Sequence, residues 1–441
     1  MSHKKEDVVN TLINKAKIGL ETLQTGGAEQ AVCAVSREVV REINATWGEF
    51  SLYRTLFNDS VSFMAIRDQK RGVLSQNKVG EDDLREGAKR CLDSAEAADP
   101  DDCWQLAPEV TEQLFEEGSL VCDEEKLLNR CQEFLDDVKE RYPMICVEEM
   151  YVSHLFRESC ALYSTGSVFQ ARRGVYAVSL MFNAQEGDKT SSFFGSDVVV
   201  ATLDHPFIEL GSFAGDLALV SKQVHTSALE EKFKGVMVLV PGCFGSFLDD
   251  YISTFVADSV ILDGTSVWRD KLGQKVADPR FTFSLAPFHP DMVAGERHTS
   301  EGYLSEDYDL IADGILKSFR LSDYAARKTG FARSKNSVFG NFVVAPGDES
   351  IDEIIKEIDR GILVGRFSGG SPSTSGDFSG VVKNTFLIEN GEVKGALSET
   401  MVSGNLAELL LNIRAISSEV VKDGSSVLPW IAFNDVIVSG K

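Results

Sequence analysis

The sequence predicts an α+β fold in which two related helix-sheet-helix units precede a β-rich C-terminal domain with a few helices. Stretches with apolar residues at helical spacing flank stretches with strand-like alternation, and this order occurs twice before residue 229. The 441 residues also exceed one ordinary core, since domains hold roughly 100–200 residues each. We therefore expect an N-terminal α+β domain over residues 1–228, with units at about 1–100 and 101–228, and a C-terminal domain over residues 229–441.

The first unit is predicted to contain a helix, a small antiparallel sheet and a second helix. Apolar residues spaced i, i+4 predict a helix over residues 5–24, and helical spacing returns over residues 81–97. Between them, residues 30–76 are rich in Val, Phe, Ile and Thr, with turn-forming residues at Asn58-Asp59. The positions that carry these patterns are Val8, Val9, Leu12, Ile13 and Ala16 in the first helix, Val61, Phe63 and Ala65 in the sheet, and Leu84, Ala88, Leu92 and Ala95 in the second helix.

The second unit repeats this order of elements. A helical stripe over residues 127–138 precedes strand-like segments over residues 145–203, and a final helix is expected over about 207–224. The stripe consists of Leu127, Leu128, Cys131, Phe134, Leu135 and Val138. The similarity between the two units lies in the order of elements and not in residue identities.

The C-terminal domain is predicted to begin with a buried strand over residues 234–240, a turn at Pro241-Gly242 and a short helix over about 246–256. The glycine- and serine-rich stretch 365–380 predicts a long irregular loop. The remaining predicted elements are a helix between residues 406 and 416 and an alternating strand over residues 431–438.

The composition excludes several classes of partner. A formal net charge of −24 repels phosphate groups, so neither nucleic acid nor an anionic membrane surface is expected to bind. The most apolar short run, residues 236–240, is far below the ~20 residues that a spanning helix needs, and no signal peptide is recognisable. No two of the eight cysteines are separated by only two residues, the spacing of thiolate metal sites. We expect reduced thiols and a cytoplasmic protein.

Most sequence signatures of catalysis are absent. The sequence contains no G-x-S-x-G elbow, no G-x-x-x-x-G-K-[ST] phosphate loop and no EF-hand pattern. The histidines are His3, His154, His205, His225, His289 and His298. None is followed by glutamate or lies three to five positions from another, so a helical zinc-histidine motif cannot be built.

The glycine-rich stretch is one candidate for a binding surface, because glycine lets a second backbone approach closely. The residues that would line a peptide groove there are Arg366, Phe367, Ser368, Gly369, Gly370, Asp377 and Phe378. A mobile surface loop is the alternative, and the residues alone favour it.

Asp249 and Asp250 are a second candidate, as a carboxylate pair for acid-base chemistry. Adjacent residues on a helix point ~100° apart, which favours a solvated helix face over a catalytic pair.

Four segments of the C-terminal half form a recognisable signature. They are residues 361–370, 376–380, 386–391 and 398–405, with supporting matches at 309–316 and 323–328. This signature resembles that of the TldD/PmbA family of peptidases. The order and spacing of the segments are specific, and the resemblance extends more weakly through the N-terminal units, so it covers most of the chain.

The resemblance implies a heteromeric peptidase. Its TldD-type subunit carries an H-E-x-x-x-H helix that binds zinc, with a further cysteine ligand near the C-terminus, and its PmbA-type subunit, also called TldE, lacks that helix motif. This chain is similar to the second type. The positions that match the motif are Asp249, Asp250 and Thr254, and the last cysteine is Cys243. We therefore predict no catalytic residue, no metal ligand and no cofactor here, with zinc only in a TldD-type partner.

The resemblance favours a non-catalytic TldE/PmbA-like subunit of a cytoplasmic peptidase complex for peptide maturation or degradation. Such a subunit would pair with a TldD-type subunit or with itself and present unfolded peptide. An autonomous hydrolase that uses Asp249 and Asp250 is one alternative, because two carboxylates suit an oxygen-ligated cation better than tetrahedral zinc. A regulator linked to DNA gyrase without direct DNA contact is the second alternative, after an older description of the family.

Overall fold

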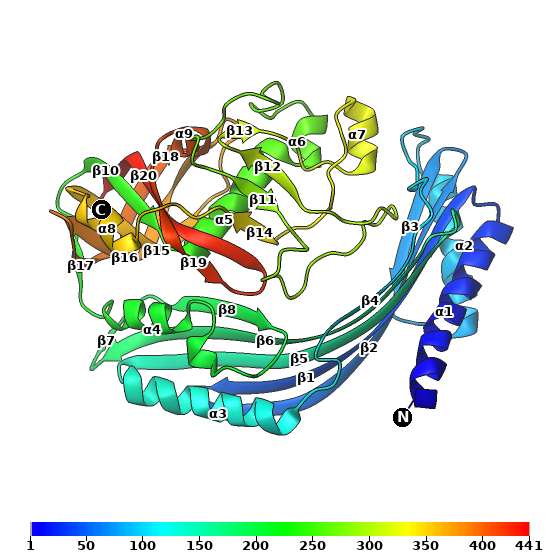
Figure 1. The fold of residues 1–441 in the computed structure, drawn as a ribbon, viewed down its shortest axis with the longest axis horizontal. Helices are drawn as coiled ribbons and strands as arrows, with labels where there is room; N and C mark the ends of the chain where they lie inside the picture. The colour runs from blue at the N-terminus through cyan, green and yellow to red at the C-terminus, as the bar shows by residue number, and fades with distance from the viewer. Residues whose placement is uncertain (1, 441) are drawn as a thin grey trace.

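The structure is a computed structural model that describes the backbone of residues 2–440 and the side chains of residues 11–440. The described chain forms an eight-stranded sheet and a twelve-stranded sheet with helices packed against them (Figure 1). The predicted α+β class is confirmed. Val8 and Val9, two of the apolar positions of the first predicted helix, lie outside the described side chains.

The first sheet contains the strands of both predicted units. Its strands are β1 (Gln30–Thr46), β2 (Glu49–Arg67), β3 (Lys70–Gln76), β4 (Glu112–Gly118), β5 (Ile145–Tyr163), β6 (Val168–Glu186), β7 (Lys189–Thr190) and β8 (Phe194–Val200). The order is β3-β2-β1-β5-β6-β4, with β8 on the second half of β6. Since β1 and β5 pair antiparallel over 15 residue pairs, Val32↔Tyr163 to Thr46↔Glu149, the two units share one continuous sheet.

The turn predicted at Asn58-Asp59 is wrong, because both residues lie inside β2. Asp59 stands opposite Arg37 of β1, and the Arg37 guanidinium donates to its carboxylate at 2.9 Å. This ion pair accommodates a turn-forming residue within a strand. The hairpin turn lies instead at Trp47-Gly48, where both residues have positive φ.

Helices cover one face of this sheet. The helices are α1 (Ser2–Thr25), α2 (Glu81–Ala97), α3 (Glu124–Arg141) and α4 (Phe213–Ser221). Cys33 and Val35 of β1 pack in the core under α1 and α2, and Ile43 packs in the core under α3. Side chains an even number of residues apart on a strand share a face, so α1, α2 and α3 lie on the same side, and α4 packs in the same core as α3.

The helix predicted over residues 207–224 is interrupted. A 3-10 helix over Phe207–Glu209 precedes α4, and the break falls at Gly211, whose φ is 53°. Glycine adopts this left-handed conformation without steric cost, so the chain changes direction there before α4 begins.

The opposite face of the sheet curves around the C-terminal domain (Figure 1). Its middle part is polar: Glu38 of β1 stands opposite Arg157 of β5, and their charged groups lie 3.4 Å apart. Ser36 and Glu42 on the same face are also buried polar residues. This side of the sheet is therefore suited to water and polar groups.

The second sheet forms the C-terminal domain. Its strands are β9 (Thr226–Ala228), β10 (Phe233–Leu239), β11 (Phe283–Leu285), β12 (Tyr308–Ala312), β13 (Ile315–Leu316), β14 (Phe342–Val344), β15 (Arg360–Gly369), β16 (Asp377–Glu389), β17 (Glu392–Ser398), β18 (Thr400–Asn405), β19 (Ile413–Lys422) and β20 (Ser426–Ser439). Its helices are α5 (Pro241–Tyr251), a π-helix over Ile252–Val256, α6 (Asp258–Leu262), α7 (Asp323–Thr329), α8 (Ile351–Lys356) and α9 (Leu406–Leu411). Strand β20 is central and pairs with β10, β14, β18 and β19.

Two predicted helices of this domain have different bounds. The helix α5 begins at Pro241, because proline suits the first helical position, where its missing N–H has no acceptor in any case. The predicted turn at Pro241-Gly242 is therefore wrong. The helix expected between residues 406 and 416 ends at Leu411, and Ile413 already belongs to β19.

The long loop predicted over residues 365–380 is also wrong. Strand β15 continues to Gly369, β16 starts at Asp377, and the irregular part is limited to residues 370–376. Gly369 and Gly380 stand opposite each other, and a Cβ on either would lie 2.5 Å from the Phe367 ring. These glycines make room for an aromatic ring and do not loosen the backbone.

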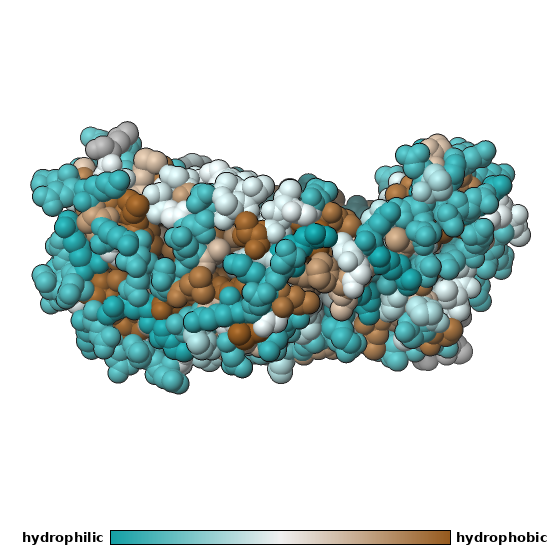
Figure 2. All heavy atoms as spheres, turned by 90° about the horizontal axis from the view of Figure 1, so that it is seen from above, coloured by the Kyte–Doolittle hydropathy of each residue, from teal (hydrophilic) through white to brown (hydrophobic). Residues whose placement is uncertain are grey.

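The two domains also meet away from the second sheet. Glu117 at the end of β4 accepts from Arg173 of β6 and from Arg297 of the C-terminal domain, both at 2.5 Å. Trp104 stacks on Tyr324 of α7, with ring centroids 3.8 Å apart. Hydrophilic residues cover most of the face seen from above (Figure 2). None of the helices in the described residues is both long and apolar enough to cross a membrane.

Candidate functional site

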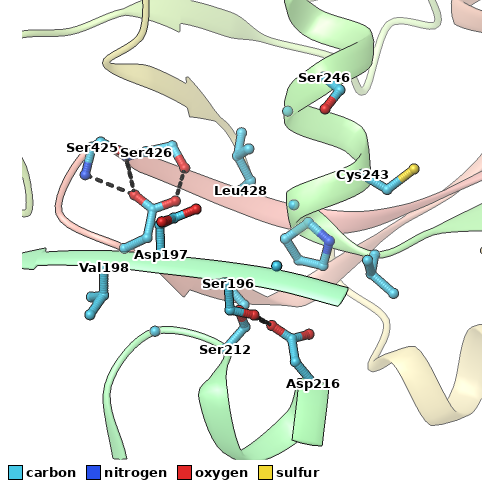
Figure 3. A pocket seen from close by; sticks show the side chains of 18 of the residues that line it. Ser196, Asp197, Val198, Ser212, Asp216, Cys243, Ser246, Ser425, Ser426 and Leu428 are labelled. Atoms are coloured by element: carbon cyan, nitrogen blue, oxygen red, sulfur yellow. Dashed lines mark hydrogen bonds between the residues drawn. The ribbon is translucent and has the colours of Figure 1, made fainter. Parts of the chain in front are cut away.

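A cavity of about 860 Å³ lies between the two domains. One wall comes from β8 and the beginning of α4, and the facing walls come from α5, β15 and the β19–β20 hairpin (Figure 3). Ligand cavities commonly have this size and commonly lie between domains, so this space is the candidate functional site.

The helix α5 presents one face to the cavity. Gly242, Gly245, Ser246 and Asp249 line it, at the i, i+3, i+4, i+7 spacing of a single helical face. The buried strand β10 directly precedes α5 and fixes its start in the core, where Met237, Val238 and Leu239 are fully buried. The two glycines keep this face shallow, so the cavity extends up to the helix backbone.

The two carboxylates of the predicted pair, Asp249 and Asp250, have different surroundings. Asp249 lines the cavity, whereas Asp250 does not. Burial raises the pKa of Asp249 to about 6, and the nearby charge of Asp250 adds to this effect. Burial also raises the pKa of Asp250. Both residues are half-buried, so the expected solvated helix face is not what the structure has.

The wall formed by the N-terminal domain is polar. Asp216 of α4 is buried and accepts from the hydroxyls of Ser196 and Ser212, the latter at 2.6 Å (Figure 3). Burial raises the pKa of Asp216 to about 6, although both hydroxyl donors act in the opposite direction. Across the cavity, the carboxylate of Asp423 accepts hydrogen bonds from Ser425 and Ser426. The charges of these two carboxylates are therefore partly compensated.

Arg366 of β15 brings a positive charge to the cavity wall. Its guanidinium lies 3.9 Å above the ring of Phe193, and its Nη2 donates to the hydroxyl of Ser192 at 3.0 Å. The buried Nε has no hydrogen-bond partner, and no carboxylate in residues 11–440 forms an ion pair with this side chain. Burial lowers the pKa of Arg366, since the charged form has lost water.

The structure brings only part of the predicted groove to the cavity. Arg366 and Phe367 line it. Four of the other candidates, Ser368, Gly369, Gly370 and Asp377, are exposed and outside the lining. Phe378 is buried, with its ring centroid 5.6 Å from that of Phe247.

Sequence reasoning missed Ser196, Asp197, Asp216 and Asp423, which all line the cavity. Nothing in the spacing of these residues connects β8, α4 and the β19–β20 hairpin, because only the packing of the two domains brings them together. The usable signals were the predicted strand and helix around Asp249 and the family segment that contains Arg366.

Residues 234–440 match the family model of the PmbA/TldA metallopeptidase C-terminal domain. This span includes α5, β15 and β20, and so most of one side of the cavity. The C-terminal domain of this chain is thus a domain of the TldD/PmbA family. The resemblance carried by the four C-terminal segments is thereby confirmed.

Curated TldD/PmbA relatives match over part of their length. The chain is 32% identical to Metalloprotease PmbA of Escherichia coli over 183 residues, which are 38% of this chain and 40% of that protein. It is 26% identical to a metalloprotease of Methanothermobacter thermautotrophicus over 307 residues, 65% of this chain and 66% of that protein. The chain thus spans between two fifths and two thirds of these relatives.

Solved structures of the family match over nearly the whole chain. TldE from Thermococcus kodakarensis superposes with a TM-score of 0.81 and 20% identity, covering 96% of this chain and 99% of that one. A Bacteroides thetaiotaomicron protein, whose structure is described as that of a modulator of DNA gyrase, gives the same TM-score and identity, covering 97% and 98%. Both likenesses establish the fold.

The side chains at the motif positions do not fit the zinc site of a TldD-type subunit. Asp249, Asp250 and Thr254 provide oxygen atoms only, whereas that motif provides two imidazoles. Cys243 lies one turn and a half before Asp249 on α5, but burial raises the pKa of its thiol to about 12, so it stays protonated. In the described side chains, a group of three residues able to hold a metal occurs at Asp101, Asp102 and Cys103, outside the cavity.

The three positions lie on two consecutive helical segments. Thr254 lies in the π-helix, where the N–H of Ala257 donates to the carbonyl of Ile252 five residues earlier, at 2.9 Å. A π-helix has more residues per turn than an α-helix, so residues five apart come closer to one face. Asp249 and Asp250 therefore lie on α5, and Thr254 lies on the π-helix that continues it.

Proposed function

We propose that this TldD/PmbA-family chain is a non-catalytic, TldE-like subunit of a peptidase complex that matures or degrades peptides together with a TldD-type metallopeptidase subunit. One observation carries the proposal: a ligand-sized cavity borders α5, while the motif positions Asp249, Asp250 and Thr254 hold no nitrogen or sulfur donor. Peptide hydrolysis of this kind needs a metal to polarise the carbonyl and activate water. We therefore assign binding to this chain and hydrolysis to its partner.

An open strand edge supports assembly with a partner. Strand β2 pairs with β1 along its whole length, but β3 covers only residues 61–67 of its other edge. Over residues 49–60 that edge has no neighbour in the described chain. The exposed apolar side chains beside it are Trp47, Phe50, Leu52, Tyr53 and Phe57. A long, apolar, open edge is a template for pairing with another chain, so we place the partner contact here.

The thiols support a cytoplasmic location. All eight cysteines are free, and five of them are buried. Disulfides are rare in the reducing cytosol, so this pattern agrees with the proposed compartment.

Two alternatives receive less support. An autonomous hydrolase would need Asp249 and Asp250 at one place, yet only Asp249 lines the cavity. For a gyrase-linked role, the net charge of −24 speaks against direct contact with DNA.

Peptide cleavage assays test the proposed function. The purified chain, a purified TldD-type protein and their mixture are each incubated with an unfolded peptide, and the products are followed by mass spectrometry. We expect no cleavage by this chain alone, and cleavage by the mixture that chelator abolishes. Cleavage by this chain alone, with a stoichiometric bound metal, contradicts the proposal.

A further inference from the structure

Among the side chains of residues 11–440, the charge of Arg366 has no counter-ion. The guanidinium is half-buried between the Phe193 ring, Ser192 and the cavity. Taking a charge out of water is costly unless an opposite charge or hydrogen bonds replace the water. Ser192 supplies one neutral acceptor, and the Nε remains without one. The position is incomplete without an anion.

A second cation adds to this imbalance. Lys383 of β16 stands directly opposite Arg366 across the β15–β16 pair. Opposed residues of an antiparallel pair project to the same face, and like charges there repel each other. No ion pair joins Lys383 to any carboxylate of residues 11–440. Lys383 does not line the cavity, so it adds positive charge near Arg366 without contacting a bound anion.

The first turn of α5 adds donors on the same cavity. Gly242 lines the cavity, and a Cβ placed on it would meet no atom within 4 Å. The first N–H groups of a helix have no acceptor within the helix and carry the positive end of its dipole. No described side chain caps these N–H groups at the start of α5. These N–H groups therefore add to the attraction that Arg366 exerts on an anion in the cavity.

The acidic side of the cavity limits which anion fits. Asp197 and Asp249 also line it, and no hydrogen bond or ion pair of either carboxylate is found in the described side chains. A multiply charged phosphate would be repelled by these groups. A molecule with one carboxylate and separate N–H or ammonium donors satisfies both sides, and a cavity of about 860 Å³ has room for a few residues of peptide.

We propose that this cavity binds a short peptide through its free C-terminal carboxylate, which pairs with the Arg366 guanidinium, while N–H donors of the peptide face Asp249. The inference rests on the proposed function, because it names what a non-cleaving subunit holds. Arg366 acts as the specificity-determining residue, since a guanidinium can bind a carboxylate with two parallel hydrogen bonds.

Calorimetric titration of the full chain tests this proposal. The probes are tetra-alanine with a free C-terminus and the same peptide with a C-terminal amide, at low salt. We expect the free acid to bind roughly 10- to 100-fold more tightly than the amide, as hydrogen bonds to charged groups allow. Arg366→Gln should remove this difference by weakening only the free acid, and Arg366→Lys should retain part of it.

Arg360→Gln is the matched control. Arg360 lies on the same strand and also stacks on a ring, 4.4 Å from the centroid of Phe233, but it is not part of the cavity wall. Its substitution should leave both affinities unchanged, and thermal unfolding should show that all three variants are folded.

Several results would overturn the inference: no binding of either peptide, equal binding of the acid and the amide, or an unchanged preference in Arg366→Gln. If inorganic phosphate displaces the free acid at a similar concentration, the cavity binds anions in general and not peptides. That result would also overturn the inference. The titration uses the chain alone without cleavage, so its failure is distinct from a failure of the cleavage assay above.

Discussion

The carboxyl group of Asp249 carries a pH dependence that stability measurements can detect. Its pKa is raised from 3.8 to about 6 in the folded protein, so the folded state keeps a proton that the unfolded chain releases. The free energy of unfolding therefore falls as pH rises from about 4 to 6, and it stays lower above that window. Replacing Asp249 removes this penalty at neutral pH.

Asp249→Asn is expected to raise the free energy of unfolding by about 1–2 kcal/mol at pH 7.5 and to change it little at pH 4, because one pKa unit corresponds to about 1.4 kcal/mol before screening by solvent. Urea unfolding at the two pH values measures this. Asp188→Asn, at an exposed position of the β6–β7 turn, is the control and should be neutral at both. If Asp249→Asn changes the free energy of unfolding equally at both pH values, burial of the Asp249 carboxylate is not the cause of the change.

The pair of Gly369 and Gly380 lies under Phe367, so bulk at Gly380 must displace that ring. Gly380→Ala should lower the free energy of unfolding by about 1–3 kcal/mol, as other substitutions that overpack a core do. Gly395→Ala, also in a strand but with no atom within 4 Å of the new Cβ, should be neutral or slightly stabilising. Chemical denaturation of both variants provides the comparison, and equal stabilities would contradict this account of the glycines.

At the level of elements, the open edge of β2 is the position where assembly can be disturbed without altering the cavity. Phe57 is 75% exposed on this edge. Phe57→Lys should weaken association with a TldD-type subunit or with a second copy at least tenfold, because a lysine on an edge strand opposes pairing. Size exclusion with light scattering measures the association.

Val110→Lys is the control, because Val110 is 67% exposed just before β4, at the other end of the sheet from β2. It should leave the association unchanged. If Phe57→Lys weakens the association no more than Val110→Lys does, the partner contact lies on another surface.

The hydrophobic pattern of a segment predicted its secondary structure correctly where the segment had a clear helical or strand periodicity. The helix over residues 81–97 has the predicted bounds, and Val61, Phe63 and Ala65 are all buried. Predictions failed where tertiary contacts reverse a local preference. Asp59 stays in a strand because Arg37 faces it, and Gly380 is ordered because Phe367 covers it.

The candidate site was harder to predict, for a physical reason. Asp249 and Arg366 could be found from sequence because a helix pattern and a family segment mark them. Asp216 and Asp423 lie on elements more than 200 residues apart in sequence, and no periodicity relates them. Their proximity depends on how one domain sits on the other.

For the whole molecule, one partly buried carboxylate joins arginines of both domains at one of the contacts between them. Glu117 lies between Arg173 and Arg297, and the Arg297 side chain is only 12% exposed. Glu117→Gln should lower the unfolding temperature and separate calorimetric unfolding into two transitions, since it leaves two arginines close together without a counter-ion.

The neighbouring Glu116 provides the control for this prediction. It pairs with Arg172 within the N-terminal domain and is half exposed. Glu116→Gln should cost less than about 1 kcal/mol, the usual value for a surface ion pair, and should leave a single transition. A single transition in Glu117→Gln as well would show that other contacts are sufficient to join the domains.

The central place of β20 has a consequence for synthesis of the protein. Four other strands of the second sheet hydrogen-bond to residues 426–439, so none of them gains its full set of partners until this segment has left the ribosome. Until then, more than 150 residues of the C-terminal domain remain incompletely folded on the ribosome. Exposed unpaired strands of this kind bind chaperones or aggregate. A premature stop codon before residue 426 would therefore release a product without a folded second domain, which quality control would remove.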